Sequence, residues 1–390
     1  MDAPRVLVTV YPQVGHLHPL IPTARALADA GCRVLVAISA RQHAPLAAAG
    51  LEAVDLGPSQ DEVSPRVREV MPALLAAAPA ARRAIAFSFL FGHVYAAAIA
   101  EDLLACAREW RADVVFAGLE SLAGPLVAAQ IDRPLVVSSF GTGLGQDVRE
   151  ASALAVAPLW ERAGLGVAVA AGLFDGLLVD PCPPSLRPDD VAVGARSQRV
   201  RPAQYDGIGA LPPLPAQRPL VYITFGTNPH FATAQRLQAI AQAISAVGAG
   251  AVITGVDRDA IGPLPDGVVA HAFVPQSALL PSCDVVLCHG GASTLFGALA
   301  SGLPLLVMPL GADHFANAAA AARRGVAVVL DADANVQAVE TGLRRVLTDG
   351  GMRRAAQVVA DEIVAMPSPA AAADGILAWL ARGDRAPHVT

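Results

Sequence analysis

The chain contains no lysine, and all 28 of its Lys-or-Arg residues are arginine. This absence is typical of a GC-rich genome and has no chemical meaning by itself. The acidic residues number 34, which leaves a net charge of −6 at pH 7. Proteins that bind nucleic acid usually carry a basic surface instead. The charge balance therefore disfavours a nucleic-acid partner.

Long apolar runs are also missing, although 54% of the residues are hydrophobic. Alanine and valine supply most of this content, in helices and short strands that Gly and Pro interrupt. No run reaches the roughly 20 residues that a membrane-spanning helix needs. The first residues form an acidic start and a short strand, without the charged and apolar regions of a signal peptide. We therefore expect a cytoplasmic protein with no membrane insertion.

Cysteine is scarce, and the five cysteines are scattered among apolar neighbours. Their odd number and spacing do not indicate a disulfide framework. Cys283, Cys288 and His289 have the residue types of a metal site, but Cys288 lies in an apolar strand and no second ligand pair follows. The sequence has no convincing DxD-type metal motif, and no GxGxxG motif follows the first strand. We expect neither a metal nor a bound cofactor, and an NAD-binding domain is disfavoured.

The remaining pattern is an alternation of strands and helices, which predicts an α/β fold with doubly wound parallel sheets. A chain of 390 residues exceeds what one core usually holds, so two domains are expected. Predicted strands cover residues 5–10, 33–38, 113–117 and 134–138 in the first half. In the second half they begin at 220 and continue through 251–255, 268–273, 285–288 and 305–308. A helix is expected over 18–30.

The domain boundaries follow from changes in composition. Residues 62–111 read as long helical segments, and 147–178 as a second, irregular helical stretch. Residues 187–219 are rich in Pro, Gly and Arg with little periodicity, as in a linker. We predict a first domain over 1–200, a linker over 201–219, a second domain over 220–370 and a final helix within 371–390.

Residues 273–317 carry the strongest functional signal. A short apolar strand ends at Cys288 and is followed by His289, Gly290 and Gly291. Ser293 and Thr294 then stand as N-cap candidates of an apolar helix that ends before Pro304. A glycine turn that leads into a helix N-terminus binds phosphate in α/β proteins, because backbone N–H groups can approach the anion. The second half is therefore predicted to bind a diphosphate.

Several separated motifs resemble the nucleotide-sugar-dependent GT-B glycosyltransferases of natural-product and plant glycosylation. They are FVPQ at 273–276, HGGAST at 289–294, GLPLLVMP at 302–309, ADHFANA at 312–318, LVYITFGT at 220–227 and GHLHPLIP at 15–22. The resemblance extends over essentially the whole chain. It implies two Rossmann-like domains facing a cleft, with a C-terminal helix that crosses back to the first domain. It also implies an inverting transferase.

In the resembled family, the histidine of the first motif is the general base that deprotonates the acceptor, and His16 holds this position. Without the family, the residues favour the simpler interpretation of His16 as a loop histidine that caps the following helix. The family often adds a carboxylate that orients this histidine. Gly118 stands where an acidic residue is expected, and the nearest carboxylate is Glu120. Glu120 therefore either orients His16 or has a packing or acceptor-lining role, and His18 either starts the helix or contacts the acceptor.

The variable helical regions of the first domain wall the acceptor pocket in this family. The aromatic residues in the middle of 62–111 that we assign to this pocket are Phe87, Phe91 and Tyr95.

The resemblance assigns the donor site to the second half. His289, Gly290, Gly291, Ser293 and Thr294 should hold the diphosphate, with Gly226 and Thr227 in a second turn of the same cradle. Asp313 is kept from an Asp-Gln pair that binds the sugar, and His314 replaces the glutamine. Phe273 stands where plant relatives have a base-stacking tryptophan, with backbone at Val274 and Gln276 as the alternative contact. Gly297 replaces a glutamate that accepts from the ribose hydroxyls, which favours a dTDP-sugar over a UDP-sugar.

The predicted function is transfer of a sugar, with a deoxy sugar as one option, from a nucleoside diphosphate to a hydroxyl of a small apolar natural-product aglycone. Three alternatives stay open: C-glycosylation of an aromatic ring, a sugar-nucleotide 2-epimerase, and a non-catalytic auxiliary protein of the same fold. The expected partners are the nucleotide-sugar and the acceptor, and a homodimer is possible.

Overall fold

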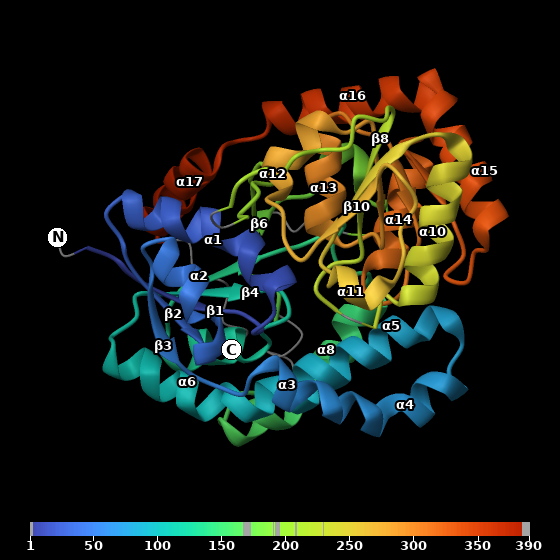
Figure 1. The fold of residues 1–390 in the computed structure, drawn as a ribbon. Helices are drawn as coiled ribbons and strands as arrows, with labels where there is room; N and C mark the ends of the chain where they lie inside the picture. Colours follow the sequence, from blue (N-terminus) through green and yellow to red (C-terminus); the bar gives the residue numbers. More distant parts are fainter. Residues whose placement is uncertain are drawn as a thin grey trace. The chain divides into compact units, whose positions relative to one another are not determined.

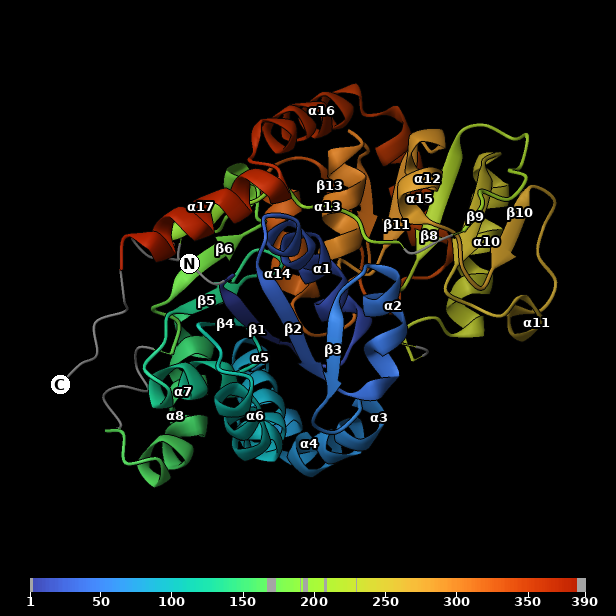
Figure 2. The same cartoon turned by 90° about the vertical axis from the view of Figure 1, so that its left-hand side faces the viewer.

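The computed structural model describes residues 3–166, 173–189, 191, 196–206, 209–228 and 230–383. Contacts divide the chain into two compact units (Figures 1 and 2). The N-terminal unit comprises Met1–Cys182, Asp189–Arg201 and Pro367–Thr390, and the C-terminal unit comprises Pro183–Pro188 and Pro202–Met366. Residues 202–206 and 209–219 of the expected linker thus belong to the C-terminal unit by their contacts.

The N-terminal unit is built on a seven-stranded sheet whose pairs are all parallel, with the order β3-β2-β1-β4-β5-β6-β7. Its strands are β1 Arg5–Thr9, β2 Arg33–Ile38, β3 Glu52–Asp55, β4 Val114–Gly118, β5 Leu135–Ser138, β6 Leu177–Asp180 and β7 Ser197–Arg199. Central strands of a parallel sheet are buried on both faces, which is why β1 and β4 are almost wholly apolar.

The helices of this unit are α1 Val14–Asp29, α2 His43–Ala48, α3 Gln60–Val63, α4 Val67–Ala76, α5 Pro79–Phe87, α6 Ala97–Glu109, α7 Ala123–Gln130, α8 Gln146–Arg162 and α17 Pro369–Ala381. Between α5 and α6 the chain forms a nine-residue π-helix, η3 Ser88–Ala96. π-Helical turns are rare and frequently mark functional sites. The C-terminal helix α17 packs beside α1 (Figure 1).

The C-terminal unit has a six-stranded parallel sheet with the order β10-β9-β8-β11-β12-β13. Its strands are β8 Leu220–Thr224, β9 Gly250–Thr254, β10 Val268–His271, β11 Val285–Cys288, β12 Leu305–Val307 and β13 Ala327–Val329. Its helices are α10 Ala234–Val247, α11 Arg258–Ile261, α12 Gln276–Leu279, α13 Ala292–Ala300, α14 His314–Arg323, α15 Val336–Thr348 and α16 Gly350–Ala365. Helix α10 packs on α15, and α13 packs on α16 (Figure 1).

The predicted doubly wound α/β fold is confirmed, and the strands expected in both halves are present. Three other expectations are corrected. Strand β6 begins at Leu177, at the end of the stretch 147–178 that we expected to be helical, of which residues 167–172 fall outside the described part. Strands β3, β7 and β13 were also missed, because they are short and lie at sheet edges. Helix α1 begins at Val14 rather than His18, since its two prolines, Pro19 and Pro22, lie inside the helix instead of marking its start.

One helical stretch, Ala81–Glu109, is long and apolar enough to cross a membrane by length and composition alone. The expectation that no such run exists is therefore wrong. Gly350–Ala365 and Pro369–Ala381 pass the same test only when they are taken together. In Ala81–Glu109, 56% of the apolar window is buried inside the protein. Packing in the core of the N-terminal unit, through residues such as Tyr95 and Leu103, accounts for this composition.

Candidate functional site

Both candidate sites lie where the strand order of a sheet reverses. In the N-terminal unit the reversal falls between β1 and β4, and His16 and Glu120 follow the carboxyl ends of these two strands. In the C-terminal unit it falls between β8 and β11, which are followed by Gly226 and His289. Helices leave such a point on opposite faces, so a crevice opens there, and open α/β sheets bind their ligands in it.

His16 and Glu120 face each other inside the N-terminal unit. Glu120 Oε2 lies 3.4 Å from His16 Nδ1, and the Glu120 side chain is only 1% exposed. The other carboxylate oxygen, Oε1, accepts a 3.1 Å hydrogen bond from the backbone N–H of Tyr11. This bond fixes the carboxylate beside the imidazole. His16 Nδ1 is itself buried, so Nε2 is the ring nitrogen that can exchange a proton with a ligand.

Gly118 makes room for this carboxylate. A Cβ atom built at position 118 would lie 2.6 Å from Glu120 Oε1 and 3.0 Å from Oε2. Real Cβ atoms essentially never approach within 3.0 Å, so a side chain at 118 would displace the Glu120 carboxylate from its present position. The carboxylate of Glu120 thus occupies the volume into which an acidic residue at 118 would project.

Aromatic rings surround His16. The centroid of Phe140 lies 5.0 Å from that of His16, Tyr11 lies at 5.6 Å and Phe91 at 5.7 Å, all edge to face. Such contacts hold the imidazole in one orientation. Sequence reasoning missed Tyr11 and Phe140. Their position just after β1 and β5, at the carboxyl edge of the sheet, is the signal that could have found them.

The residues predicted to line the acceptor pocket differ in their surroundings. Phe87 and Phe91 are each 8% exposed and pack together with their ring centroids 4.6 Å apart. Tyr95 is completely buried and donates to the carbonyl oxygen of Val10, so the structure places it in the core rather than on a ligand-facing surface. His18 lies two residues after His16 in α1, and residues at this spacing point to different faces of a helix.

In the C-terminal unit, the imidazole of His289 fits against two glycines. A Cβ atom at Gly226 would lie 3.0 Å from His289 Nε2, and one at Gly291 would lie 2.6 Å from it. Gly226 also has a φ of +73°, which other residues rarely adopt. The turns after β8 and β11 therefore meet at this ring, so Gly226 and His289 do lie together. Thr227, the next residue of the first turn, is exposed.

Helix α13 begins one turn earlier than its candidate caps suggest. The N-cap residue is Gly291, and no side chain caps the helix. Ser293 and Thr294 lie in the first turn instead, so the prediction that they cap α13 is wrong. The first N–H groups of α13 consequently have no side-chain acceptor of the capping kind. Gly290, with a φ of +91°, forms the turn in front of the helix.

Asn317 ties Asp313 to the same turn. Its Nδ2 donates to Asp313 Oδ2 at 2.7 Å and to the carbonyl oxygen of Gly290 at 2.9 Å. Asn317 is fully buried, and it is a residue whose role sequence reasoning did not identify. His314 is also buried, and its Nδ1 accepts from the backbone N–H of Leu310 at 3.4 Å. The neutral ring therefore carries its proton on Nε2.

His289 and His314 contact each other and share a low pKa. Their ring centroids are 4.5 Å apart at an interplanar angle of 89°, and the ring of Phe231 packs near both. Burial, together with the neighbouring His314, lowers the pKa of His289 to about 4, against the opposing effects of Asp313 and of a hydrogen bond with the backbone of Thr224. Burial likewise lowers the pKa of His314 to about 4. Both imidazoles are neutral at pH 7, so each can donate one N–H to a phosphate without carrying charge.

These low pKa values predict acid sensitivity. Each histidine has a folded pKa below its ordinary value of about 6.5, so the unfolded chain binds more protons between pH 6.5 and 4. Stability is therefore present above pH 6.5 and is lost as the pH falls towards 4. Between pH 7 and 5 the free energy of unfolding should fall by roughly 2 kcal/mol per histidine. Urea unfolding of His314→Gln should show a smaller fall than wild type.

The exposed His230 of the same unit offers the control for this experiment. His230→Gln should keep the wild-type pH dependence, because it removes an imidazole from the surface and not from the buried pair. An unchanged pH dependence in His314→Gln would show that the pair does not determine acid stability.

Phe273 is 59% exposed and precedes α12, so its ring is available for stacking. Val274 is buried, and Gln276 is the first residue of α12. Within the described residues no group of three or more His, Cys, Asp or Glu could hold a metal ion. All five cysteines have free thiols, and burial raises the pKa of Cys283 and Cys288 to about 12, which keeps both thiols protonated.

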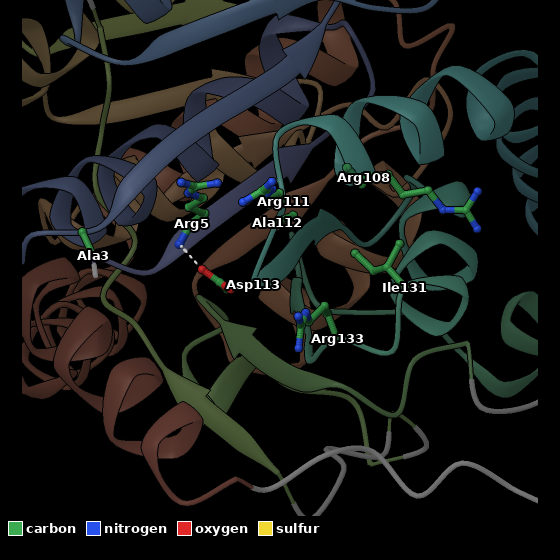
Figure 3. Close-up of a pocket in the computed structure, with 9 residues that line it drawn as sticks. Ala3, Arg5, Arg108, Arg111, Ala112, Asp113, Ile131 and Arg133 are labelled. Carbon is green, nitrogen blue, oxygen red and sulfur yellow. Dashed lines mark hydrogen bonds between the residues drawn. The ribbon is translucent and has the colours of Figure 1, made fainter. Parts of the chain in front are cut away.

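A separate cavity of about 450 Å³ lies at the opposite, amino-terminal edge of the first sheet (Figure 3). Its charged lining residues are Arg5, Arg108, Arg111, Asp113 and Arg133. Arg5 donates from its backbone N–H to Asp113 and from its guanidinium to the carbonyl oxygen of Trp110. The arginines lie around the carboxyl ends of α6 and α7, where the helix dipole favours cations. This stabilisation explains their concentration there, and we assign the cavity no part in catalysis.

The two parallel-sheet units and the diphosphate-type turn before α13 define the GT-B class of nucleotide-sugar-dependent glycosyltransferases. Family models agree: residues 25–215 match the N-terminal domain, and 235–378 the C-terminal domain, of the erythromycin biosynthesis protein CIII-like family. The chain belongs to this family of bacterial natural-product glycosyltransferases. It is a GT-B enzyme that transfers a sugar.

Individual relatives match over nearly their whole length. The L-demethylnoviosyl transferase of Streptomyces niveus is 33% identical, over 96% of this chain and 98% of the relative. The elloramycin glycosyltransferase ElmGT of Streptomyces olivaceus is 32% identical, over 94% and 95%. Among solved structures, the spinosyn rhamnosyltransferase SpnG complexed with thymidine diphosphate has a TM-score of 0.79 and 28% identity, over 96% and 100% of the two chains.

Proposed function

We propose that this glycosyltransferase moves a sugar, deoxygenated in its preferred donor, from dTDP to a hydroxyl of a small apolar acceptor with inversion at the anomeric carbon. The contact between His16 Nδ1 and the buried carboxylate of Glu120 is the observation that carries the proposal. A negative charge at Nδ1 keeps the proton on that nitrogen and leaves Nε2 free to act as a base. His16 is then the general base, and Glu120 is the residue that positions it.

In the proposed reaction the acceptor oxygen attacks the anomeric carbon while His16 Nε2 takes its proton. The bond between the anomeric carbon and the diphosphate oxygen breaks on the opposite side, so one displacement inverts the configuration. Charge builds up on the departing diphosphate as this bond breaks. The N–H groups at the start of α13 and a neutral His289 can donate to it, and a helix N-terminus favours negative charge.

A relative and the residues of this chain both support a thymidine nucleotide as the carrier of the donor sugar. The solved relative SpnG was complexed with thymidine diphosphate. In this chain, Gly297 offers no carboxylate to the hydroxyls of a ribose. His314 is neutral and its Nδ1 accepts from the Leu310 N–H, so the ring can offer only its Nε2–H to a sugar, which suits a sugar with fewer hydroxyls.

The donor preference can be measured directly. With one sugar offered on dTDP and on UDP, we expect kcat/KM to be about 5–100-fold higher for dTDP, because UDP lacks the methyl group of the base and carries an additional 2′-hydroxyl. Calorimetric titration with dTDP and UDP in metal-free buffer should show the same order. A clear preference for UDP would contradict the dTDP assignment. Binding of neither nucleotide would favour the auxiliary-protein alternative.

The configuration and the linkage of the product test the other parts of the proposal. An α-linked donor should give a β-linked product by NMR, and a retained configuration would exclude a single displacement. A carbon–carbon linkage in the product would identify a C-glycosyltransferase, since a base at His16 serves either nucleophile.

A further inference from the structure

Part of the segment that connects the two units in sequence packs on the donor-binding side of the C-terminal unit. Gln204 Nε2 donates to the carbonyl oxygen of Ser293 at 3.0 Å. Gln204 Oε1 accepts from Gln276 Nε2 at 2.7 Å. Two residues later, the carboxylate of Asp206 accepts from the backbone N–H of Ser277. Residues 204–206 therefore join the first turn of α13 to α12, although 89 residues separate Gln204 from Ser293 in the sequence.

The two glutamines fill the volume beside Gly297. A Cβ atom at Gly297 would lie 2.5 Å from Gln204 Nε2 and 2.6 Å from Gln276 Nε2. Both approaches are too close, so a side chain at 297 would require the two carboxamides to shift. The carboxamides thus stand where the resembled family has a glutamate. Gln204 and Gln276 are both only partly buried, so a ligand can reach their polar groups.

The covalent order of a nucleotide places its pentose at this point. Phe273, the candidate base-stacking residue, precedes Gln276 by three positions, and the backbone of Gly209 runs against Phe273 and Pro275. The candidate diphosphate contacts lie at the start of α13, next to Ser293. Since a pentose joins base and diphosphate in every nucleotide, a nucleotide that uses both contacts must carry its pentose past the glutamine pair.

We propose that Gln204, together with Gln276, reads the pentose of the donor nucleotide and selects deoxyribose over ribose. The inference rests on the proposed function, because it concerns the same donor site. A carboxylate can accept from both hydroxyls of a ribose at once. The Gln204 carboxamide is neutral, and its oxygen and one of its N–H groups are already engaged with Gln276 and Ser293. It can bond a single 3′-hydroxyl, and a 2′-hydroxyl is left without a good acceptor, which costs binding free energy.

The test distinguishes the contribution of the pentose to binding affinity from the contribution of the base. Calorimetric titration with dTDP, dUDP and UDP in metal-free buffer compares nucleotides that differ by one group at a time. The first pair isolates the methyl group of the base, and the second pair isolates the 2′-hydroxyl. Wild type should bind dUDP about 5–10-fold more tightly than UDP, as expected for one unpaired hydroxyl.

Three variants identify the residue responsible. Gln204→Ala should bring the dUDP-to-UDP affinity ratio close to one, and Gln204→Glu should raise UDP affinity relative to dUDP because it restores a carboxylate. Gln238→Ala is the matched control: Gln238 is also half-buried and donates to backbone carbonyls, of Ile261 and Pro263, but on α10. It should keep the wild-type ratio.

The outcomes distinguish failure of the pentose inference from failure of the proposed function. A Gln204→Ala protein that binds all three nucleotides more weakly by the same factor would overturn the inference, since that is the result of a purely structural contact. An unchanged ratio would overturn it as well and would leave the proposed function standing. Failure of wild type to bind any of the three nucleotides would overturn the proposed function and the inference together.

Discussion

Replacing His16 by alanine should lower turnover by roughly 10²–10⁴-fold at neutral pH, the usual contribution of a general base. The donor contacts that we propose come from the C-terminal unit, so the affinity for dTDP should change little. His16→Ala also removes a ring that packs edge to face on Tyr11, Phe91 and Phe140. Thermal unfolding must therefore accompany the kinetics. Steady-state turnover with saturating donor and acceptor measures the effect.

A matched variant separates loss of the base from loss of a histidine on this unit. His93 is exposed on η3, and its ring centroid lies 6.2 Å from that of Phe89, which is not among the rings that contact His16. His93→Ala should keep wild-type turnover. Wild-type turnover in His16→Ala would remove His16 as the base.

Acceptor acidity gives a second and independent readout for His16. A base matters most when the attacking hydroxyl is hard to deprotonate, and it matters least when the nucleophile ionises readily in water. The His16→Ala defect should therefore shrink for a nitrophenol or a thiophenol, compared with an alkyl alcohol. A defect of equal size for all these acceptors would indicate a binding or packing role instead.

Some strands of this fold could be predicted from the sequence and others could not, depending on whether the strand is central or at a sheet edge. The buried central strands β1, β4, β8 and β11 are uninterrupted apolar runs, and such runs are readily recognised. Strand β3, with the sequence EAVD, lies at the sheet edge and is half polar, so no pattern distinguishes it from a loop. Strand β6 follows a region of small apolar residues that suits either helix or strand.

The residues of the candidate site also differ in how readily the sequence predicts them. His16, His289 and Asp313 are found from sequence because each lies in a local motif next to a strand end or a helix start. Gln204 and Asn317 act through contacts with distant backbone carbonyls, 89 and 27 residues away. Such contacts depend on how the elements pack, which short-range patterns do not encode. The displaced start of α1 has a related cause, because Pro19 is a start signal only when no residues before it can continue the helix.

The second large effect is expected at Glu120. Glu120→Gln keeps the size of the side chain and an oxygen for the Tyr11 N–H, but it removes the charge beside His16 Nδ1. An amide can also present an N–H to Nδ1 and so favour the wrong tautomer. In a serine protease the corresponding change costs about 10⁴-fold. The 3.4 Å separation found here is longer, so we expect a loss of about 10–10³-fold in turnover, with dTDP affinity unchanged.

The closeness of position 118 to the Glu120 carboxylate allows a relocation experiment. In Gly118→Asp/Glu120→Ala, the new carboxylate occupies the space that Glu120 vacates, because the Cβ at 118 points at the former Oε1 position. The double variant should recover at least about tenfold of the turnover lost in Glu120→Ala, since a charge again faces His16. Gly118→Asn/Glu120→Ala has the same shape without the charge, and it should recover nothing.

Stability must be followed alongside turnover in this series, because Glu120→Ala leaves the buried Tyr11 N–H without its acceptor, which costs about 1–3 kcal/mol. Gly118→Asp alone should be the least stable of these proteins, because it forces two carboxylates into one buried volume. A charge-dependent recovery of turnover, at equal stability of the Asp and Asn double variants, identifies Glu120 as the residue that orients His16. Equal turnover of those two double variants would instead reduce Glu120 to a packing residue, and His16 would then act without a carboxylate partner.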